Sequence, residues 1–133
     1  MALQIFLPGD PPTTTAQTRA VRVINGKPVF YDPPQLARAK AYLHDALIPY
    51  VPEAPYDGPL RLIVKWCFPR GSHEHGAYKT TRPDTDNLQK LLKDTMTRLH
   101  YWIDDALVAS EISEKFWTDK PGIYIRIEEL DEA

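Results

Sequence analysis

The stretch Leu60-Arg61-Leu62-Ile63-Val64-Lys65-Trp66-Cys67-Phe68 carries the clearest secondary-structure signal in the chain. Apolar side chains occupy every second position from Leu60 to Phe68, which is typical of a strand that has one face in a protein core. Pro69 follows and ends the pattern, because proline cannot donate a hydrogen bond to a neighbouring strand. We therefore expect residues 60–68 to form a strand of the main sheet.

Two helical patterns lie on either side of this strand in the sequence. The first follows Asp32-Pro33, with Asp32 expected as the N-cap and the proline in the first turn, and Pro49 limits it. The second follows Pro83. Each pattern repeats apolar side chains on one helical face, which predicts packing against a sheet. These side chains are Leu36, Ala39, Leu43, Leu47 and Tyr50 in the first helix and Leu88, Leu91, Leu92, Met96 and Leu99 in the second.

The remaining strand signals lie near the two ends of the chain. Residues 3–7 alternate as a first strand, and residues 21–31 read as a hairpin that turns at Asn25-Gly26. Strands near residues 107–117 and 123–128 stand on either side of a turn and are expected to pair as a closing hairpin. Together these elements predict an α+β fold, a small mixed β-sheet with two main α-helices on one face.

The length and composition predict one domain that spans residues 1–133. Within it, residues 10–30 are expected to form an arm and hairpin, and the polar residues 70–82 a mobile loop. No apolar run is long enough to span a bilayer, and residues 1–8 lack the basic start of a secretory signal. The single cysteine, Cys67, agrees with a reducing cytosol, so we expect a cytoplasmic protein without a membrane partner.

The formal net charge of −2 does not indicate a nucleic-acid-binding protein, but the charges are unevenly distributed. Residues 61–98 hold eight Lys or Arg and four acidic residues, whereas residues 99–133 hold three Lys or Arg and nine acidic residues. A local basic region can face a polyanion while the whole chain stays acidic. On charge alone, an ordinary solvated surface is the simpler explanation.

Aspartates around the second helix are the candidate functional residues. Asp84 and Asp86 stand at the predicted helix start, and Asp105 follows the helix. Clustered carboxylates can hold hard divalent cations, and Lys90, one turn after Asp86, can contact a phosphate. Pro83 favours a helix start at residues 84–86, so that both early carboxylates can point beyond the helix N-terminus.

Each of these motifs also has an explanation that needs no metal. An aspartate near a helix start can cap the helix, which stabilises it by about 1 kcal/mol. Asp104-Asp105 can form a turn. His73-Glu74-His75 can bind a metal only where the backbone makes the side chains converge, and a solvated loop is favoured there. The residue chemistry alone leaves the capping and metal-binding explanations of the aspartates open.

The segment from Arg82 to Val108 resembles the RusA family of Holliday-junction resolvases. The resemblance rests on Asp-x-Asp-Asn-Leu-Gln-Lys at residues 84–90 and Trp-Ile-Asp-Asp-Ala at residues 102–106. It implies a RusA-like fold and a small, homodimeric, Mg²⁺-dependent endonuclease of a bacterium or prophage. By position, it implies that Asp84, Asp86 and Asp105 are metal-binding catalytic carboxylates and that Lys90 is a catalytic lysine. Asp104 is a secondary candidate, and Asn87 and Gln89 belong to the motif without an assigned role.

The function that this resemblance implies is hydrolysis of DNA phosphodiesters at four-way (Holliday) junctions. Paired symmetric nicks would resolve recombination or replication intermediates, with Mg²⁺ or Mn²⁺ as the cofactor. Two alternatives stay open, a metal-dependent nuclease that acts on other branched DNA and a non-catalytic DNA-binding or assembly protein with the same fold. The side chains expected to contact the DNA are Arg19, Arg22, Lys79, Arg82 and Lys93.

Overall fold

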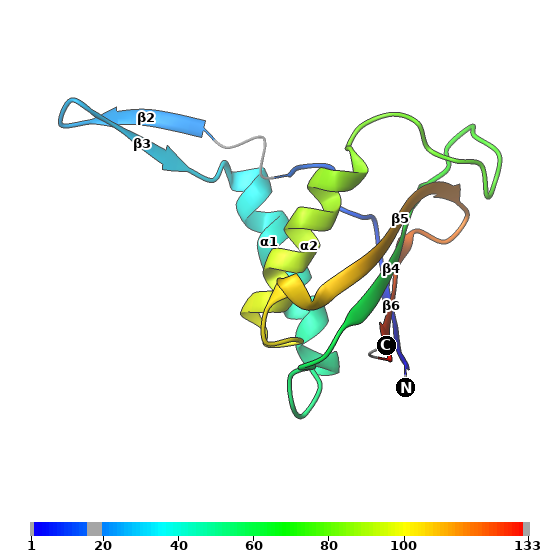
Figure 1. Cartoon of the computed structure of the whole chain (residues 1–133). Coiled ribbons are helices and arrows are strands. Elements are labelled where there is room, and N and C mark those ends of the chain that lie inside the picture. Colours follow the sequence, from blue (N-terminus) through cyan, green and yellow to red (C-terminus); the bar gives the residue numbers. More distant parts are fainter. Residues whose placement is uncertain (1, 16–19, 132–133) are drawn as a thin grey trace.

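A computed structural model describes residues 2–15 and 20–131 of the chain (Figure 1). Arg19, an expected DNA contact, lies outside the described residues. The elements, in chain order, are β1 (Ala2–Pro8), β2 (Ala20–Ile24), β3 (Lys27–Tyr31), α1 (Pro34–Leu47), the 3₁₀ turn η2 (Ile48–Tyr50), β4 (Leu60–Pro69), α2 (Thr85–Arg98), the 3₁₀ turn η3 (Asp105–Leu107), β5 (Val108–Thr118) and β6 (Gly122–Glu129).

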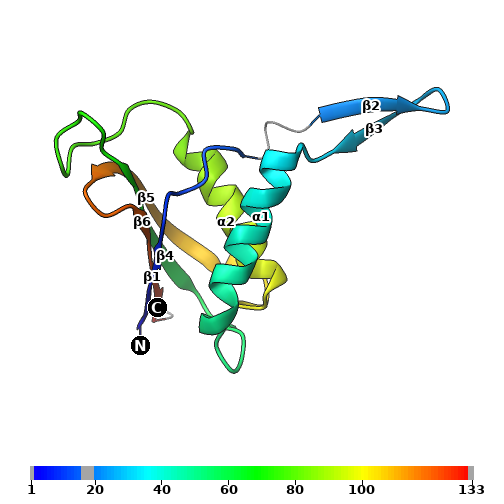
Figure 2. The same ribbon diagram turned by 180° about the vertical axis from the view of Figure 1, so that it is seen from behind.

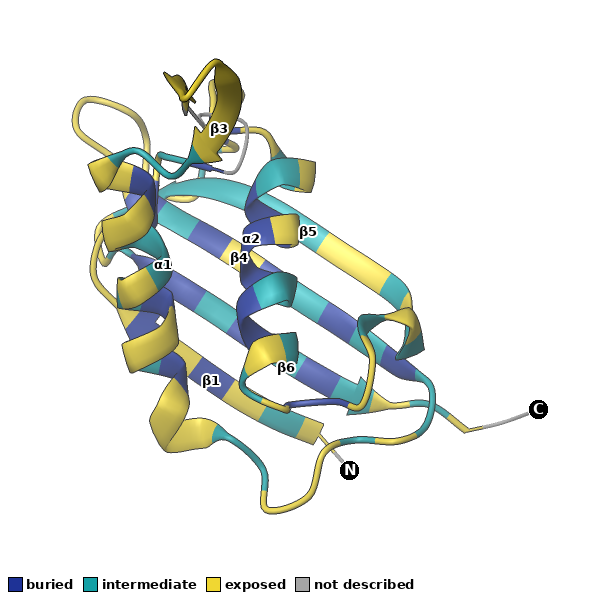
Figure 3. Cartoon of the chain, turned by 90° about the vertical axis from the view of Figure 1, so that its left-hand side faces the viewer, coloured by how far each residue is buried: buried dark blue, intermediate teal, exposed yellow. Residues whose placement is uncertain are grey.

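The body of the molecule is a four-stranded mixed sheet in the order β1-β6-β4-β5. Strand β4 lies inside the sheet and pairs antiparallel with β6 and parallel with β5, while β1 pairs antiparallel with β6. Figure 3 shows α1 and α2 side by side over one face of this sheet. The predicted α+β architecture with two helices on one face is therefore confirmed.

The predicted closing hairpin is wrong, because β5 and β6 do not pair with each other. Strand β4 lies between them, and the turn after Thr118 carries the chain past the end of β4 to reach β6. Strand β6 sends Ile123, Ile125 and Ile127 into the core, whereas β5 holds none of the buried core residues. The more apolar strand therefore takes the inner position beneath the helices, and the more polar strand takes the edge.

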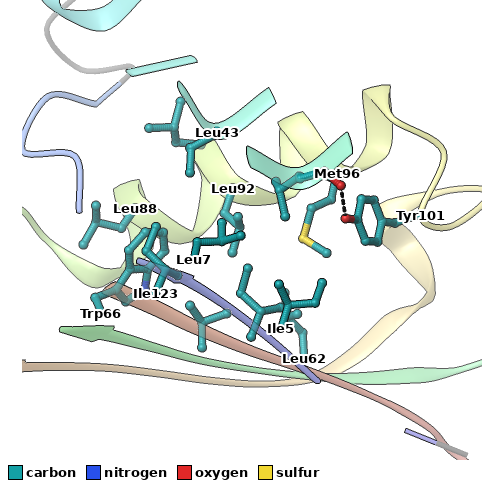
Figure 4. Packing of buried hydrophobic residues seen from close by; sticks show 14 of the residues in the cluster. Ile5, Leu7, Leu43, Leu62, Trp66, Leu88, Leu92, Met96, Tyr101 and Ile123 are labelled. Atoms are coloured by element: carbon teal, nitrogen blue, oxygen red, sulfur yellow. Dashed lines mark hydrogen bonds between the residues drawn. The ribbon is translucent and has the colours of Figure 1, made fainter. Parts of the chain in front are cut away.

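The core fills the space between the sheet and the helices (Figure 4). Leu62, Val64 and Trp66 point from β4 towards the helices and are fully buried. The Trp66 indole Nε1 donates a hydrogen bond to Ser113 Oγ at 3.1 Å, which ties β4 to β5. The buried Tyr101 hydroxyl donates to the Leu47 carbonyl oxygen at 2.5 Å and ties the chain after α2 to the end of α1. Burial of the Tyr101 side chain also raises the pKa of its hydroxyl.

Helix α1 begins one residue later than predicted. Its N-cap residue is Pro33, with extended dihedrals of φ −57° and ψ 155°, and no side chain makes a capping hydrogen bond. The proline at position 34 disfavours helical dihedrals in the residue before it, so the helix starts at Pro34. Asp32 is therefore not the cap, and its carboxylate accepts a hydrogen bond from Lys40 Nζ at 2.7 Å. Among the described helices, none is long and apolar enough to cross a membrane.

Strands β2 and β3 form the predicted hairpin as a separate two-stranded sheet. Asn25 and Gly26 have positive φ values of 52° and 77°, as the tight turn between two twisted strands requires. The hairpin projects away from the helices and the main sheet (Figures 1 and 2). Every residue from Val21 to Phe30 is exposed, and the Arg22 guanidinium lies 4.4 Å from the centre of the Tyr31 ring.

Candidate active site

The start of α2 has the geometry that Pro83 predicts. Asp84 is the N-cap residue in an extended conformation, with φ −75° and ψ 148°, and Asp86 lies in the first turn. The Asp84 side chain makes no capping hydrogen bond to α2, all of whose residues are described. Asp86 Oδ1 accepts a hydrogen bond from the Asn87 backbone N–H at 3.0 Å. Both carboxylates are exposed, and the Asp84 carboxylate is not used to cap the helix.

A lysine from β5 holds the segment that leads into α2. Lys115 Nζ donates hydrogen bonds to the carbonyl oxygens of Thr81 at 2.7 Å and Pro83 at 2.8 Å. An ammonium group can satisfy several acceptors at once, and charge-assisted hydrogen bonds are stronger than neutral ones. Lys115 therefore fixes the backbone directly before Asp84.

We expect Lys115→Met to loosen the first turn of α2 while the core stays intact. The variant keeps most of the apolar stem but loses two charge-assisted hydrogen bonds. Native-state hydrogen exchange at Leu88, whose backbone N–H donates to the Asp84 carbonyl oxygen, should become roughly tenfold faster, because local opening there costs less free energy. Lys120→Met, in the exposed turn after β5, is the matched control and should leave this exchange unchanged. Equal protection of α2 in both variants would contradict this role of Lys115.

A cleft of about 290 Å³ lies between α2, η3 and β5. Two predicted residues of α2, Asp86 and Lys90, share it with Asp105, the first residue of η3. Asp84 is not part of the cleft wall. The structure thus brings together three of the four expected catalytic residues and leaves the fourth at the adjacent helix start. The residues that line the cleft are Asp86, Gln89, Lys90, Lys93, Asp94, Asp105 and Glu111.

The charges of the cleft favour a cation. Four carboxylates and two ammonium groups line it, so its formal charge is negative. Lys93 Nζ forms an ion pair with Glu111, and Lys90 Nζ lies 3.7 Å from Asp94 Oδ2. Within the described residues, Asp86 and Asp105 have no ion-pair partner. Their negative charges are therefore available to a bound cation.

The donor atoms of the cleft suit a hard divalent cation such as Mg²⁺, which prefers carboxylate oxygens and retains several waters. Across residues 2–15 and 20–131, no group of three or more His, Cys, Asp or Glu side chains is close enough to hold a metal ion. The carboxylates would therefore have to turn towards one another to share a cation. Asp86 is exposed and Asp105 half-buried, so side-chain rotation alone can change their separation.

Three residues of the cleft, Glu111, Gln89 and Asp94, were not assigned a role from the sequence. Glu111 lies on β5, and its pairing with Leu62 places it on the helix-covered side of the sheet. Because Glu111 and Glu114 place carboxylates on opposite faces of this strand, the sequence pattern does not show which face is inward, and only the pairing with β4 does. Gln89 belongs to the sequence motif, and its side chain is buried in the cleft wall.

Asp104, the secondary candidate, has a structural role. Its Oδ1 accepts a hydrogen bond from the Ala106 backbone N–H at 3.0 Å and caps η3. This turn points the chain so that the next residue, Asp105, reaches the cleft. The turn explanation therefore holds for Asp104 but does not account for Asp105.

The expected DNA contacts lie in different surroundings. Arg22 and Arg82 are exposed, and Lys93 is half-buried in its ion pair with Glu111. Lys79 is only 8% exposed, with Nζ 4.3 Å from the centre of the Trp117 ring and 2.5 Å from Thr81 Oγ1. Burial, together with the nearby Lys115 ammonium, lowers the pKa of Lys79. This position leaves the Lys79 ammonium little access to a phosphate.

The loop at residues 70–82 lies along β5. Its Gly76 N–H donates to the Trp117 carbonyl at 2.7 Å, and the His73 ring stacks on Trp117 with 4.1 Å between ring centres. His75 Nδ1 accepts from the Asp119 N–H at 3.0 Å. The two histidines therefore pack against β5 and the turn after it. The expected mobility of this loop stays a prediction, and these are the contacts that its movement would break.

Comparisons with known proteins support one family. The family model described as "Endodeoxyribonuclease RusA" matches residues 8–128. A protein named "Crossover junction endodeoxyribonuclease rusA" from Lactococcus phage r1t is 32% identical over 124 residues, which cover 91% of this chain and 93% of the relative. "Uncharacterized protein YqaN" of Bacillus subtilis strain 168 is 30% identical over 118 residues, covering 80% and 82%. The chain therefore belongs to the RusA family of endodeoxyribonucleases, which hydrolyse DNA.

Proposed function

We propose that this chain is a Mg²⁺-dependent endonuclease that resolves four-way DNA junctions by paired symmetric nicks. The observation that supports it most is the cleft shared by Asp86, Lys90 and Asp105, which come from two separate elements. The phage relative is named as a crossover junction endodeoxyribonuclease, and it covers nearly the whole chain. We also propose that it acts in the cytoplasm of a bacterium, encoded by the bacterium or by a phage, since this relative is a phage protein.

The proposed mechanism assigns a task to each residue of the site. Asp86 and Asp105 would hold the divalent cation, and Asp84 would join them from the helix start. When bound, this cation supplies a water of lowered pKa and stabilises negative charge on the phosphoryl oxygens. Lys90 would donate to a non-bridging phosphate oxygen, and its ammonium lies at the cleft, 3.7 Å from Asp94 Oδ2.

The exposed basic residues would hold the DNA around the cleft. Arg22 on the hairpin and Arg82 before α2 are free to contact phosphates, and Lys93 can join them where a phosphate replaces Glu111 as its partner. Contacts of this kind make the affinity for DNA fall with rising salt concentration. Two symmetric nicks require two active sites, so we propose a two-fold symmetric homodimer.

The direct test compares cleavage of a synthetic four-way junction, a replication fork and a linear duplex of matched length. We expect nicks at symmetric positions in the junction with Mg²⁺ or Mn²⁺, and none with EDTA, because the cleft residues alone cannot generate the attacking hydroxide. The fork and duplex should be cut more slowly.

The other results of this test would each point to a different function. Equally fast cleavage of the fork would favour a nuclease for other branched DNA. Junction binding without cleavage in either metal would favour a non-catalytic DNA-binding protein. Cleavage that persists in EDTA would contradict the metal mechanism.

A further inference from the structure

Gln89, on α2, is a buried amide without a hydrogen-bond partner. The residue is 3% exposed, and neither Oε1 nor Nε2 of its side chain has a partner within the described residues. Burial of an unpaired amide costs free energy, because the hydrogen bonds that it makes with water in the unfolded chain are not replaced. Such a group in a folded protein needs a specific explanation.

The other buried polar side chain of α2, Thr95, has a hydrogen-bond partner. Thr95 is as buried as Gln89 and lies on the same helix, and its Oγ1 donates to the Leu91 carbonyl oxygen at 2.9 Å. Among the buried side-chain nitrogen and oxygen atoms of the described chain, only the two of Gln89 lack a partner. The unpaired amide is therefore a local feature of this position, not a general property of the helix packing.

The position of Gln89 connects this amide to the cleft. Asp86 precedes it by three residues and Lys93 follows it by four, so the three side chains share one side of α2. Gln89 lines the same cleft as Asp86, Asp105 and Glu111. A glutamine side chain has several rotatable bonds, so its amide can turn towards a ligand in the cleft while the helix stays in place.

We propose that Gln89 is a positioning residue whose amide becomes satisfied only when the cleft holds a hydrated divalent cation. An amide suits this task because it both donates and accepts. Nε2 would donate to a carboxylate that turns towards the cation, and Oε1 would accept from a water that the cation retains. Such outer contacts orient metal-binding carboxylates and strengthen metal binding. This inference rests on the proposed metal-dependent function.

The test is Gln89→Met, which keeps the length of the side chain and its helix propensity but removes the amide. In EDTA the variant should unfold at a temperature about 3 °C or more above wild type, because the unpaired polar group is gone. In calorimetric titrations without DNA, its affinity for Mg²⁺ or Mn²⁺ should be roughly tenfold lower. A residue with a purely structural role would not give this combination of higher stability and weaker metal binding.

Thr95→Val is the matched control, since it removes a buried polar group that has a partner. It should neither raise the unfolding temperature in EDTA nor change the metal affinity. If wild type binds metal and Gln89→Met binds it equally well, or if the variant is less stable than wild type in EDTA, this inference is wrong while the proposed function stands. If wild type binds no divalent metal, both are wrong.

Discussion

Asp86→Asn is expected to slow junction cleavage by roughly a hundredfold or more, which corresponds to about 3 kcal/mol of lost transition-state stabilisation. The change removes one of the two cleft carboxylates without an ion-pair partner but preserves the side-chain volume. Its Oδ1 can still accept the hydrogen bond from Asn87 N–H, so the first turn of α2 should form as in wild type. Single-turnover cleavage in Mg²⁺, measured beside junction affinity in EDTA, separates chemistry from binding.

The matched control is Asp45→Asn, which removes an exposed carboxylate from α1 and should leave cleavage unchanged. Junction affinity in EDTA should not fall for Asp86→Asn, because the change removes negative charge near the DNA. Cleavage by Asp86→Asn at the wild-type rate would show that this carboxylate does not take part in the reaction.

Trp66→Ala is expected to have the largest effect on stability, a loss of roughly 3–5 kcal/mol in the free energy of unfolding. Trp66 is fully buried in β4, the strand that pairs with two neighbours in the middle of the sheet. Its removal leaves a cavity beneath the helices and takes away the hydrogen bond to Ser113. Because a small domain is stabilised by only about 5–15 kcal/mol, urea denaturation should detect the change easily.

Two further variants separate the causes of this loss. Trp66→Phe keeps an aromatic ring in the core but removes the Nε1 donor, so it should lose less, roughly 1–2 kcal/mol. Ile103→Ala, at a position that is 67% exposed, should change the free energy of unfolding by less than about 0.5 kcal/mol. A loss below 1 kcal/mol for Trp66→Ala would contradict the central position of β4 in the core.

Much of the fold could be predicted because one face of each main element is buried. A strand repeats every two residues and a helix every 3.6, so a buried face leaves a readable pattern in Leu60–Phe68 and in α2. The pattern does not say which strands lie side by side. The predicted pairing of the last two strands was wrong because β4 occupies the place between them.

The candidate site could likewise be predicted only in part from the sequence. Residue chemistry and family resemblance predicted Asp84, Asp86, Lys90 and Asp105 as site residues, and the last three of these line the α2 cleft. Glu111 could not be added, because its place in the cleft depends on the pairing of β5 with β4. The sequence predicted that Lys79 contacts DNA from the loop, whereas in the structure its ammonium lies over the Trp117 ring.

The sequence by itself determined the periodic elements, the start of α2 after Pro83 and the chemical types of the candidate catalytic residues, since these follow from local sterics and side-chain chemistry. Only the tertiary structure decided the strand order, the cleft that joins Asp86 to Asp105 and the burial of the Gln89 amide. These features depend on contacts between residues far apart in the chain. Such contacts are selected by the burial of the whole apolar surface, which no local pattern records.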